Sequence, residues 1–139
     1  MKLVDANIVI YSLGREHRYR KLCRAIIDQI VVRPYDYSID AEMLQELLYV
    51  FWKRGAIDTG TEVVRQLLGL VPEAVPVGGP EIAAAARLLE RPSRLSVRDA
   101  IHAAVVFEYD LDGIISADKG FDSVSSLRRF DPREVADGC

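Results

Sequence analysis

Cysteine and histidine are scarce in this chain of 139 residues, which contains two of each. Cys23 and Cys139 stand far apart in the sequence, so they form no closely spaced metal-binding pair, and we expect no disulfide between them. Cys23 fits a buried position in a helix, and Cys139 belongs to the C-terminal tail. The scarcity of both residue types excludes a zinc site of the cysteine–histidine kind.

Long hydrophobic runs are also absent. No stretch of 18 residues is free of charge, so we expect no membrane-spanning helix. Asp5 and Asn7 interrupt the first apolar segment, which argues against a signal peptide and for a cytoplasmic protein. The net charge of −3 argues against a generally basic coat for nucleic acid. Basic residues still cluster locally, for example at Lys53 and Arg54, where a solvated helix face is the alternative interpretation.

Several common catalytic motifs are missing as well. The chain has no Walker phosphate loop, nucleophile elbow or metalloprotease motif. A phosphatase of the HAD type needs a second Asp where this chain has Asn7, and a receiver domain needs a phosphorylatable Asp after the third strand. A metal-free ribonuclease with two histidines would have to use His17 and His102, which both fall in predicted helices.

What the chain does have is a regular alternation of strand and helix patterns. Strands are predicted at Lys2–Val4, Tyr35–Ser38, Ala74–Val77, Gly113–Ser116 and Arg128–Phe130. Helices are predicted at Asn7–Leu13, His17–Val32, Ala41–Trp52, from Asp58 or Thr59 to Leu70, at Pro80–Leu89 and at Val97–Tyr109, with Asp40 and Ser96 as N-caps of two of them. This order predicts one α/β domain over residues 1–139, with a mainly parallel sheet of about five strands between two layers of helices.

Five acidic residues occupy positions that this fold would bring to the carboxyl edge of the sheet, where sites form in such folds. They are Asp5, Glu46, Asp99, Asp118 and Asp122. Two carboxylates about 4 Å apart repel each other by roughly 4 kcal/mol at an effective dielectric near 20. Protonation or a divalent cation must therefore neutralise such a cluster.

Each acidic residue also has a purely structural interpretation. Asp5 could cap a helix, Glu46 could be a boundary residue with its head in water, and Asp99 could complete a capping box with Ser96. The segment from Asp118 to Asp122 is also typical of a turn. The joint order of strand-Asp, helix-Glu, helix-Asp and strand-Ser-x-Asp-x-x-x-Asp is more specific than any one residue.

In these motifs the chain resembles the PIN-domain ribonucleases, and within them the VapC-type toxins. The resemblance is carried by Val4-Asp5-Ala6-Asn7, Leu44-Gln45-Glu46-Leu47-Leu48-Tyr49, Leu95-Ser96-Val97-Arg98-Asp99-Ala100-Ile101-His102-Ala103-Ala104 and Ile114-Ile115-Ser116-Ala117-Asp118-Lys119-Gly120-Phe121-Asp122. It spans nearly the whole chain. It implies a three-layer PIN-like fold, Mg²⁺ or Mn²⁺ as cofactor, an RNA substrate, a homodimer and a cognate antitoxin protein.

The resemblance also assigns roles to residues. It implies catalytic positions at Asp5, Glu46, Asp99 and Asp118, supporting positions at Asn7, Ser116 and Asp122, and metal ligands in Asp5, Asp99 and Asp118. We expect Arg15, Arg18, Lys53 and Lys119 to contribute to RNA binding. In-line attack by water activated by the cation would leave a 5′-phosphate and a 3′-hydroxyl. A PIN nuclease that processes RNA without an antitoxin and a catalytically silent PIN binding module are the alternatives.

Overall fold

The computed structural model describes residues 1–16 and 18–138, so predictions that involve His17 or Cys139 lie outside the described residues. The elements follow one another along the chain as β1 Lys2–Val4, α1 Ala6–Leu13, α2 Arg20–Val32, η1 Pro34–Asp36, β2 Tyr37–Asp40, α3 Ala41–Lys53, α4 Ile57–Leu70, β3 Ala74–Val75, α5 Gly79–Leu89, α6 Val97–Glu108, β4 Ile114–Ile115, η2 Lys119–Ser123, β5 Arg129–Phe130 and α7 Pro132–Asp137. The labels η1 and η2 denote short 3-10 helices.

The five strands form one sheet in the order β3-β2-β1-β4-β5, and every pairing between them is parallel. The predicted α/β fold with a parallel sheet is thus confirmed. The chain adds strands on one side of β1 and later on the other, so the strand order reverses between β1 and β4. In open α/β sheets, a crevice at the carboxyl ends of the strands opens at this reversal.

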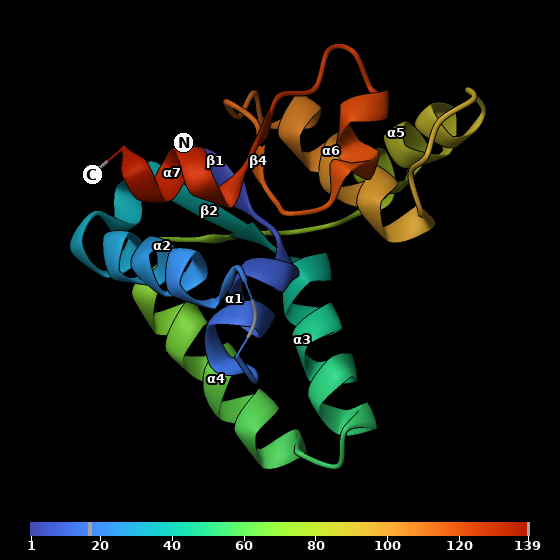
Figure 1. Cartoon of the computed structure of the whole chain (residues 1–139). Helices are drawn as coiled ribbons and strands as arrows, with labels where there is room; N and C mark the ends of the chain where they lie inside the picture. The colour runs from blue at the N-terminus through green and yellow to red at the C-terminus, as the bar shows by residue number, and fades with distance from the viewer. Residues whose placement is uncertain (17, 139) are drawn as a thin grey trace.

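Alternating side chains of the central strands enter two separate hydrophobic cores. Leu3 and Ile114 pack in one cluster with residues of α6, whereas Val4 and Ile115 pack in the other with residues of α1 to α4. Helices α5 and α6 lie on one side of the sheet, and α1, α2 and α7 lie on the other (Figure 1). Each fully buried Leu or Ile side chain contributes about 1.5–3 kcal/mol of hydrophobic free energy, so these two clusters stabilise the three layers.

Two local predictions are wrong at their boundaries. The second strand begins at Tyr37 rather than Tyr35, because Pro34 opens a short 3-10 helix over Pro34–Asp36. Helix α4 begins at Ile57, and no side chain caps it, so the predicted cap by Asp58 or Thr59 is wrong. Gly55 explains the early start: its φ of 72° is left-handed and reverses the chain directly from α3 into α4.

Other local predictions are confirmed. Asp40 caps α3 by accepting a 2.8 Å hydrogen bond from the Met43 amide, and Ser96 caps α6 by accepting one of 3.1 Å from the Asp99 amide. Cys23 is a free, buried thiol on α2. Among the residues that the structure describes, none of the helices has the length and apolar character that crossing a bilayer requires.

Candidate active site

The ends of β1 and β4 bring the first and the last acidic motif together. Val4 pairs with Ile115, so the residues that follow, Asp5 and Ser116, stand side by side. The Ser116 hydroxyl donates a 2.6 Å hydrogen bond to Oδ2 of Asp5. The same hydroxyl oxygen accepts hydrogen bonds from the Asp118 amide (3.0 Å) and from Nδ2 of Asn7 (3.1 Å). Ser116 and Asn7 therefore hold the buried Asp5 carboxylate in one orientation.

Asp99 joins this group from the first turn of α6. The pKa of Asp99 is raised from 3.8 to about 6, chiefly by burial and in addition by the negative charges of Asp5 and Asp118. Burial also raises the pKa of Asp5. Repulsion of this kind acts only over short distances. The carboxylates of Asp5 and Asp118 therefore lie close enough to that of Asp99 for their charges to interact.

Glu46 approaches from α3, where Arg98 of α6 holds it. The Arg98 guanidinium lies 3.3 Å from Oε1 of Glu46 and 3.2 Å from Oε1 of Glu42. Burial alone would raise the pKa of Glu46, but the positive charges of His102 and Arg98 outweigh it, and the pKa is lowered. Glu46 therefore stays ionised at neutral pH.

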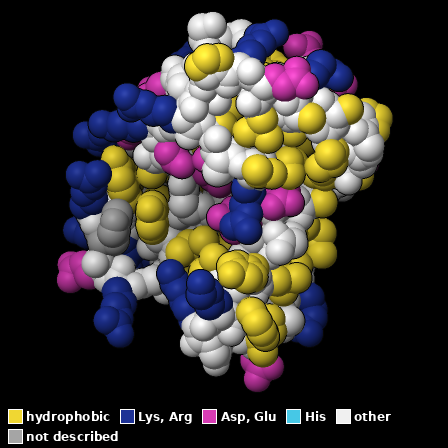
Figure 2. All heavy atoms as spheres, turned by 90° about the vertical axis from the view of Figure 1, so that its right-hand side faces the viewer, with side chains coloured by type: hydrophobic (Ala, Val, Ile, Leu, Met, Phe, Trp, Pro, Cys, Tyr) yellow, Lys and Arg dark blue, Asp and Glu magenta, His cyan; other side chains and the backbone are white. Residues whose placement is uncertain are grey.

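An open cleft of about 650 Å³ lies above these residues, between α3 and α6. Its walls include Glu46, Asp99 and Asp118, together with the cations Arg94 and Arg98. Figure 2 shows acidic and basic side chains in contact near the middle of one face of the molecule, with hydrophobic side chains around them. The carboxylates of Glu46, Asp99 and Asp118 are thus accessible from this cleft.

His102 is a site residue that the sequence reasoning did not select. Its ring is fully buried, with Nδ1 2.7 Å from Oδ2 of Asp40 and Nε2 directed at Asp5 and Glu46, 3.9 and 4.0 Å away. Burial lowers the pKa of His102, but the carboxylates of Asp40, Glu46 and Asp5 outweigh it and raise the pKa well above 6.5. The sequence did offer one indication of this role: His102 follows Asp99 by one helical turn, so the two side chains lie on the same face of the helix.

Asp122 and the cations predicted to bind RNA are not among the residues that line the cleft. Both carboxylate oxygens of Asp122 accept hydrogen bonds from the Arg129 guanidinium, at 2.9 and 3.2 Å. Lys53 lies over the Tyr49 ring and Arg18 over the Tyr19 ring. Among the described residues, the cations that line the cleft are Arg94 and Arg98, which the sequence analysis had not singled out for RNA binding.

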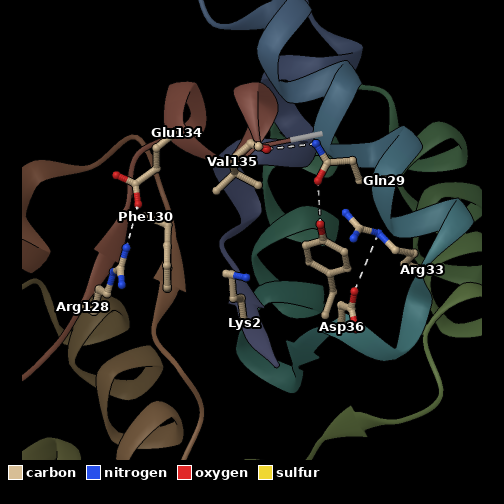
Figure 3. A pocket seen from close by; sticks show the side chains of 10 residues that line it. Lys2, Gln29, Arg33, Asp36, Arg128, Phe130, Glu134 and Val135 are labelled. Carbon is tan, nitrogen blue, oxygen red and sulfur yellow. Dashed lines mark hydrogen bonds and ion pairs between the residues drawn. The ribbon is translucent and has the colours of Figure 1, made fainter.

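A second hollow, of about 540 Å³, lies at the amino edge of the sheet, near the starts of β1, β2 and β5. Figure 3 shows Arg33 facing Asp36 and Arg128 facing Glu134 there, at 3.7 and 3.4 Å. Its acidic side chains are thus paired with arginines and form no cluster comparable to the one around Asp5.

The residues of the acidic cleft fit a divalent cation. Asp5, Glu46 and His102 each offer one atom, and these atoms lie within 4.8 Å of one another. Among the described residues, Nε2 of His102 and Oδ1 of Asn7 are buried without a hydrogen-bond partner, as expected next to a site completed by an ion or by water. Hard carboxylate oxygens suit Mg²⁺ and Mn²⁺.

Comparison with known proteins agrees with this geometry. Residues 2–127 match the model of the PIN domain family. Ribonuclease VapC13 of Mycobacterium tuberculosis is 31% identical over 133 residues, which cover 94% of this chain and 99% of that protein. The chain therefore belongs to the PIN-domain family, in its VapC ribonuclease branch.

Solved structures of low sequence identity share the fold. FitAcB from Neisseria gonorrhoeae superposes with a TM-score of 0.76 at 19% identity, covering 96% of this chain and 99% of the other. A toxin–antitoxin complex from Klebsiella pneumoniae gives a TM-score of 0.67 at 17% identity, covering 95% and 98%. At such identities the likeness establishes the three-layer fold, which confirms the predicted architecture.

Proposed function

We propose that this protein is a divalent-metal-dependent endoribonuclease and the toxin of a toxin–antitoxin pair. One observation carries the proposal: Glu46, Asp99 and Asp118 line one open cleft, and the buried carboxylate of Asp5 lies close enough to interact with Glu46 and Asp99. Such a concentration of negative charge would be unfavourable without a cation to neutralise it. The names of the relatives, ribonucleases VapC13 and VapC23, support RNA as the substrate.

The carboxylates of Asp5, Asp99 and Asp118 would hold the cation, with Glu46 beside them. Mg²⁺ or Mn²⁺ bound there would lower the pKa of a water molecule and neutralise charge on the scissile phosphate. Ser116 and Asn7 fix the orientation of Asp5, and the Ser96 cap fixes the first turn of α6, which carries Asp99. Cleavage by in-line attack of water would leave a 5′-phosphate and a 3′-hydroxyl.

RNA would reach the cleft along its basic rim. Arg94 and Arg98 line the cleft and can contact phosphates directly. We retain Lys53, Lys119, Arg15 and Arg18 as more distant contributors. Lys119 directly follows Asp118 in the chain, and Lys53 lies on α3, one helical turn beyond Tyr49, over whose ring Arg98 also lies.

The antitoxin proposal has separate support. A structural neighbour is a toxin–antitoxin complex, and its fold matches almost the whole of this chain. An antitoxin could place an arginine in the acidic cleft, where the carboxylates would accept charge-assisted hydrogen bonds from it. We further propose that the protein forms a homodimer and acts in the cytoplasm, where its RNA substrate is found. A PIN nuclease that processes RNA without an antitoxin is the second candidate.

Cleavage of a single-stranded RNA by the purified chain, with Mg²⁺, Mn²⁺ or EDTA, tests the nuclease. We expect cleavage with either ion, none with EDTA, and none by Asp5→Ala. The exposed Asp58→Asn serves as a matched control that should cleave normally. Cleavage that survives EDTA, or a wild-type protein that binds Mn²⁺ without cleaving, would contradict the proposal, and the second result would indicate a silent module.

The toxin role needs a separate experiment. Expression of the wild-type chain in bacteria should arrest growth, and Asp5→Ala should not. Co-expression of the protein encoded next to it should restore growth and inhibit RNA cleavage in vitro. Cleavage in vitro without growth arrest would favour the RNA-processing nuclease.

A further inference from the structure

The buried imidazole of His102 directs Nε2 toward Asp5 and Glu46, and this nitrogen has no hydrogen-bond partner among the described residues. Its other nitrogen, Nδ1, lies 2.7 Å from Oδ2 of Asp40. Asp40 cannot turn away, because its Oδ1 accepts a hydrogen bond from the Met43 amide and its side chain is itself fully buried. The ring is therefore locked with Nε2 pointing at Asp5 and Glu46.

The three groups that face one another here share a common arrangement. In each of these side chains, a neighbouring residue holds one polar atom by a hydrogen bond or an ion pair. The second polar atom points toward the other two side chains. Ser116 holds Oδ2 of Asp5, which leaves Oδ1 3.9 Å from Nε2 of His102. Arg98 holds Oε1 of Glu46, which leaves Oε2 4.0 Å from the same nitrogen. Proteins orient metal ligands in this way, by hydrogen bonds to the atom that does not bind the metal.

The distances from Nε2 of His102 to the oxygens of Asp5 and Glu46 suit a shared cation better than direct hydrogen bonds. At 3.9 and 4.0 Å the two approaches to Nε2 are too long for hydrogen bonds. Two ligands about 2.1 Å from a shared cation stand roughly 3 Å apart when adjacent and about 4.2 Å apart when opposite. The three atoms lie within 4.8 Å of one another, so a shortening of about 1 Å in the separations between adjacent ligands would bring all three into range of one ion.

We propose that Nε2 of His102, Oδ1 of Asp5 and Oε2 of Glu46 form a cation site with a nitrogen ligand, which Asp40 orients from behind the ring. Binding of the cation would displace the proton that Nε2 carries in the metal-free protein. This inference rests on the proposed metal-dependent function and adds a residue to it. A nitrogen ligand shifts selectivity from Mg²⁺, which prefers oxygen, toward the first-row transition ions Mn²⁺, Co²⁺ and Zn²⁺. Asp5 would serve both this site and the carboxylate set with Asp99 and Asp118.

Pulsed electron paramagnetic resonance of Mn²⁺ bound to the untagged, metal-stripped full chain tests the nitrogen ligand without any activity measurement. The sequence contains two histidines, so His17→Gln is a matched variant in which His102 is the sole imidazole. We expect coupling to an imidazole nitrogen in the wild type and in His17→Gln, and none in His102→Gln. Circular dichroism and thermal melting establish that each variant is folded.

Metal titrations give a second, independent readout. The affinity for Co²⁺ should fall roughly 10- to 100-fold in His102→Gln, while the affinity for Mg²⁺ should change by less than about threefold. Asp40→Asn should weaken Co²⁺ binding by about tenfold yet keep the nitrogen coupling, because the ring remains but loses its orienting carboxylate.

The outcomes separate the two proposals. Mn²⁺ that binds His17→Gln without imidazole coupling overturns this inference, and it would leave His102 as a charged neighbour of the carboxylates. Because that variant retains His102, the result is decisive even if His102→Gln fails to fold. EDTA-sensitive cleavage with no nitrogen coupling would leave the proposed function standing, whereas absence of any divalent binding would overturn both.

Discussion

The hydroxyl of Ser116 donates a 2.6 Å hydrogen bond to the carboxylate of Asp5, across 111 positions of sequence. The bond joins the ends of two adjacent parallel strands, β1 and β4, at the point where the strand order of the sheet reverses. It leaves the second oxygen of Asp5 3.9 Å from Nε2 of His102. The candidate active site is therefore a direct product of strand order.

Asp99→Asn should abolish cleavage while preserving the fold. The substitution keeps the shape of the side chain but removes the charge that would bind the cation. We expect RNA cleavage to fall by roughly 100-fold or more, as for loss of an essential metal-site group. Cleavage of a labelled RNA in Mg²⁺, with circular dichroism as the fold control, measures this. Normal metal-dependent activity in the variant would refute the assignment of Asp99.

The same substitution should stabilise the metal-free protein at neutral pH. The pKa of Asp99 is raised from 3.8 to about 6 by burial and by the charges of Asp5 and Asp118. A raised pKa means that ionisation of Asp99 disfavours the folded state. The contribution of Asp99 to the free energy of unfolding is therefore fully present below pH 4, where the side chain is protonated. This contribution is lost as the pH rises through 6.

We therefore expect Asp99→Asn to exceed the wild type by about 1 kcal/mol above pH 6.5 in EDTA. This energy is smaller than the full cost of raising the pKa from 3.8 to about 6, because the side chain is partly exposed and solvent screens its charge. Urea unfolding at pH 4 and at pH 7.5 measures the difference, which should vanish at the lower pH. An equal difference at both values would show that electrostatic repulsion is not its cause.

Asp122 should matter less for catalysis than Asp118. Both oxygens of Asp122 bind Arg129, which in turn donates to the Ser116 carbonyl and so supports the site indirectly. Asp122→Asn should lower cleavage by less than about tenfold and destabilise the protein by roughly 0.5 kcal/mol, as for an exposed ion pair. The comparison is with Asp118→Asn under identical conditions. A loss as large as that of Asp118→Asn would instead make Asp122 a direct metal ligand.

Trp52 should contribute to the proposed homodimer. It is 63% exposed on α3 beside Tyr49, which is 41% exposed, and the two rings lie 6.2 Å apart. A pair of exposed aromatic side chains is typical of an interface. We expect light scattering to give twice the 15.6 kDa mass of one chain for the wild type and the single mass for Trp52→Glu. Val32→Glu, at a 78% exposed position on α2, should remain dimeric.

Gly60→Ala should destabilise the packing of α3 against α4. A Cβ at Gly60 would lie 2.7 Å from Cβ of Phe51, whereas one at Gly69 of the same helix would meet nothing within 4 Å. We expect a loss of about 1–3 kcal/mol for Gly60→Ala and a gain of roughly 0.5–1 kcal/mol for Gly69→Ala. Denaturant unfolding of both variants measures this, and equal effects would contradict the close contact.

Patterns within single segments of the sequence were enough to predict the order of strands and helices and the parallel sheet. The alternation of strand and helix patterns along the chain predicted a parallel sheet between two layers of helices, and Asp40 and Ser96 marked the starts of two helices. The placement of Asp5 directly after one strand and of Asp118 shortly after another predicted that they would meet, because parallel strands end at one edge of a sheet.

The tertiary structure alone decided which side chains are partners within this fold. The pairing of His102 with Asp40, of Arg98 with Glu42 and Glu46, and of Arg129 with Asp122 depends on how α6 packs against α3 and β2 and on how β5 follows η2. These contacts join segments whose relative positions are set by burial of both sheet faces. No local pattern of residues predicts these contacts. Hydrophobic packing fixes where whole helices lie, and the polar side chains that come close as a result become partners.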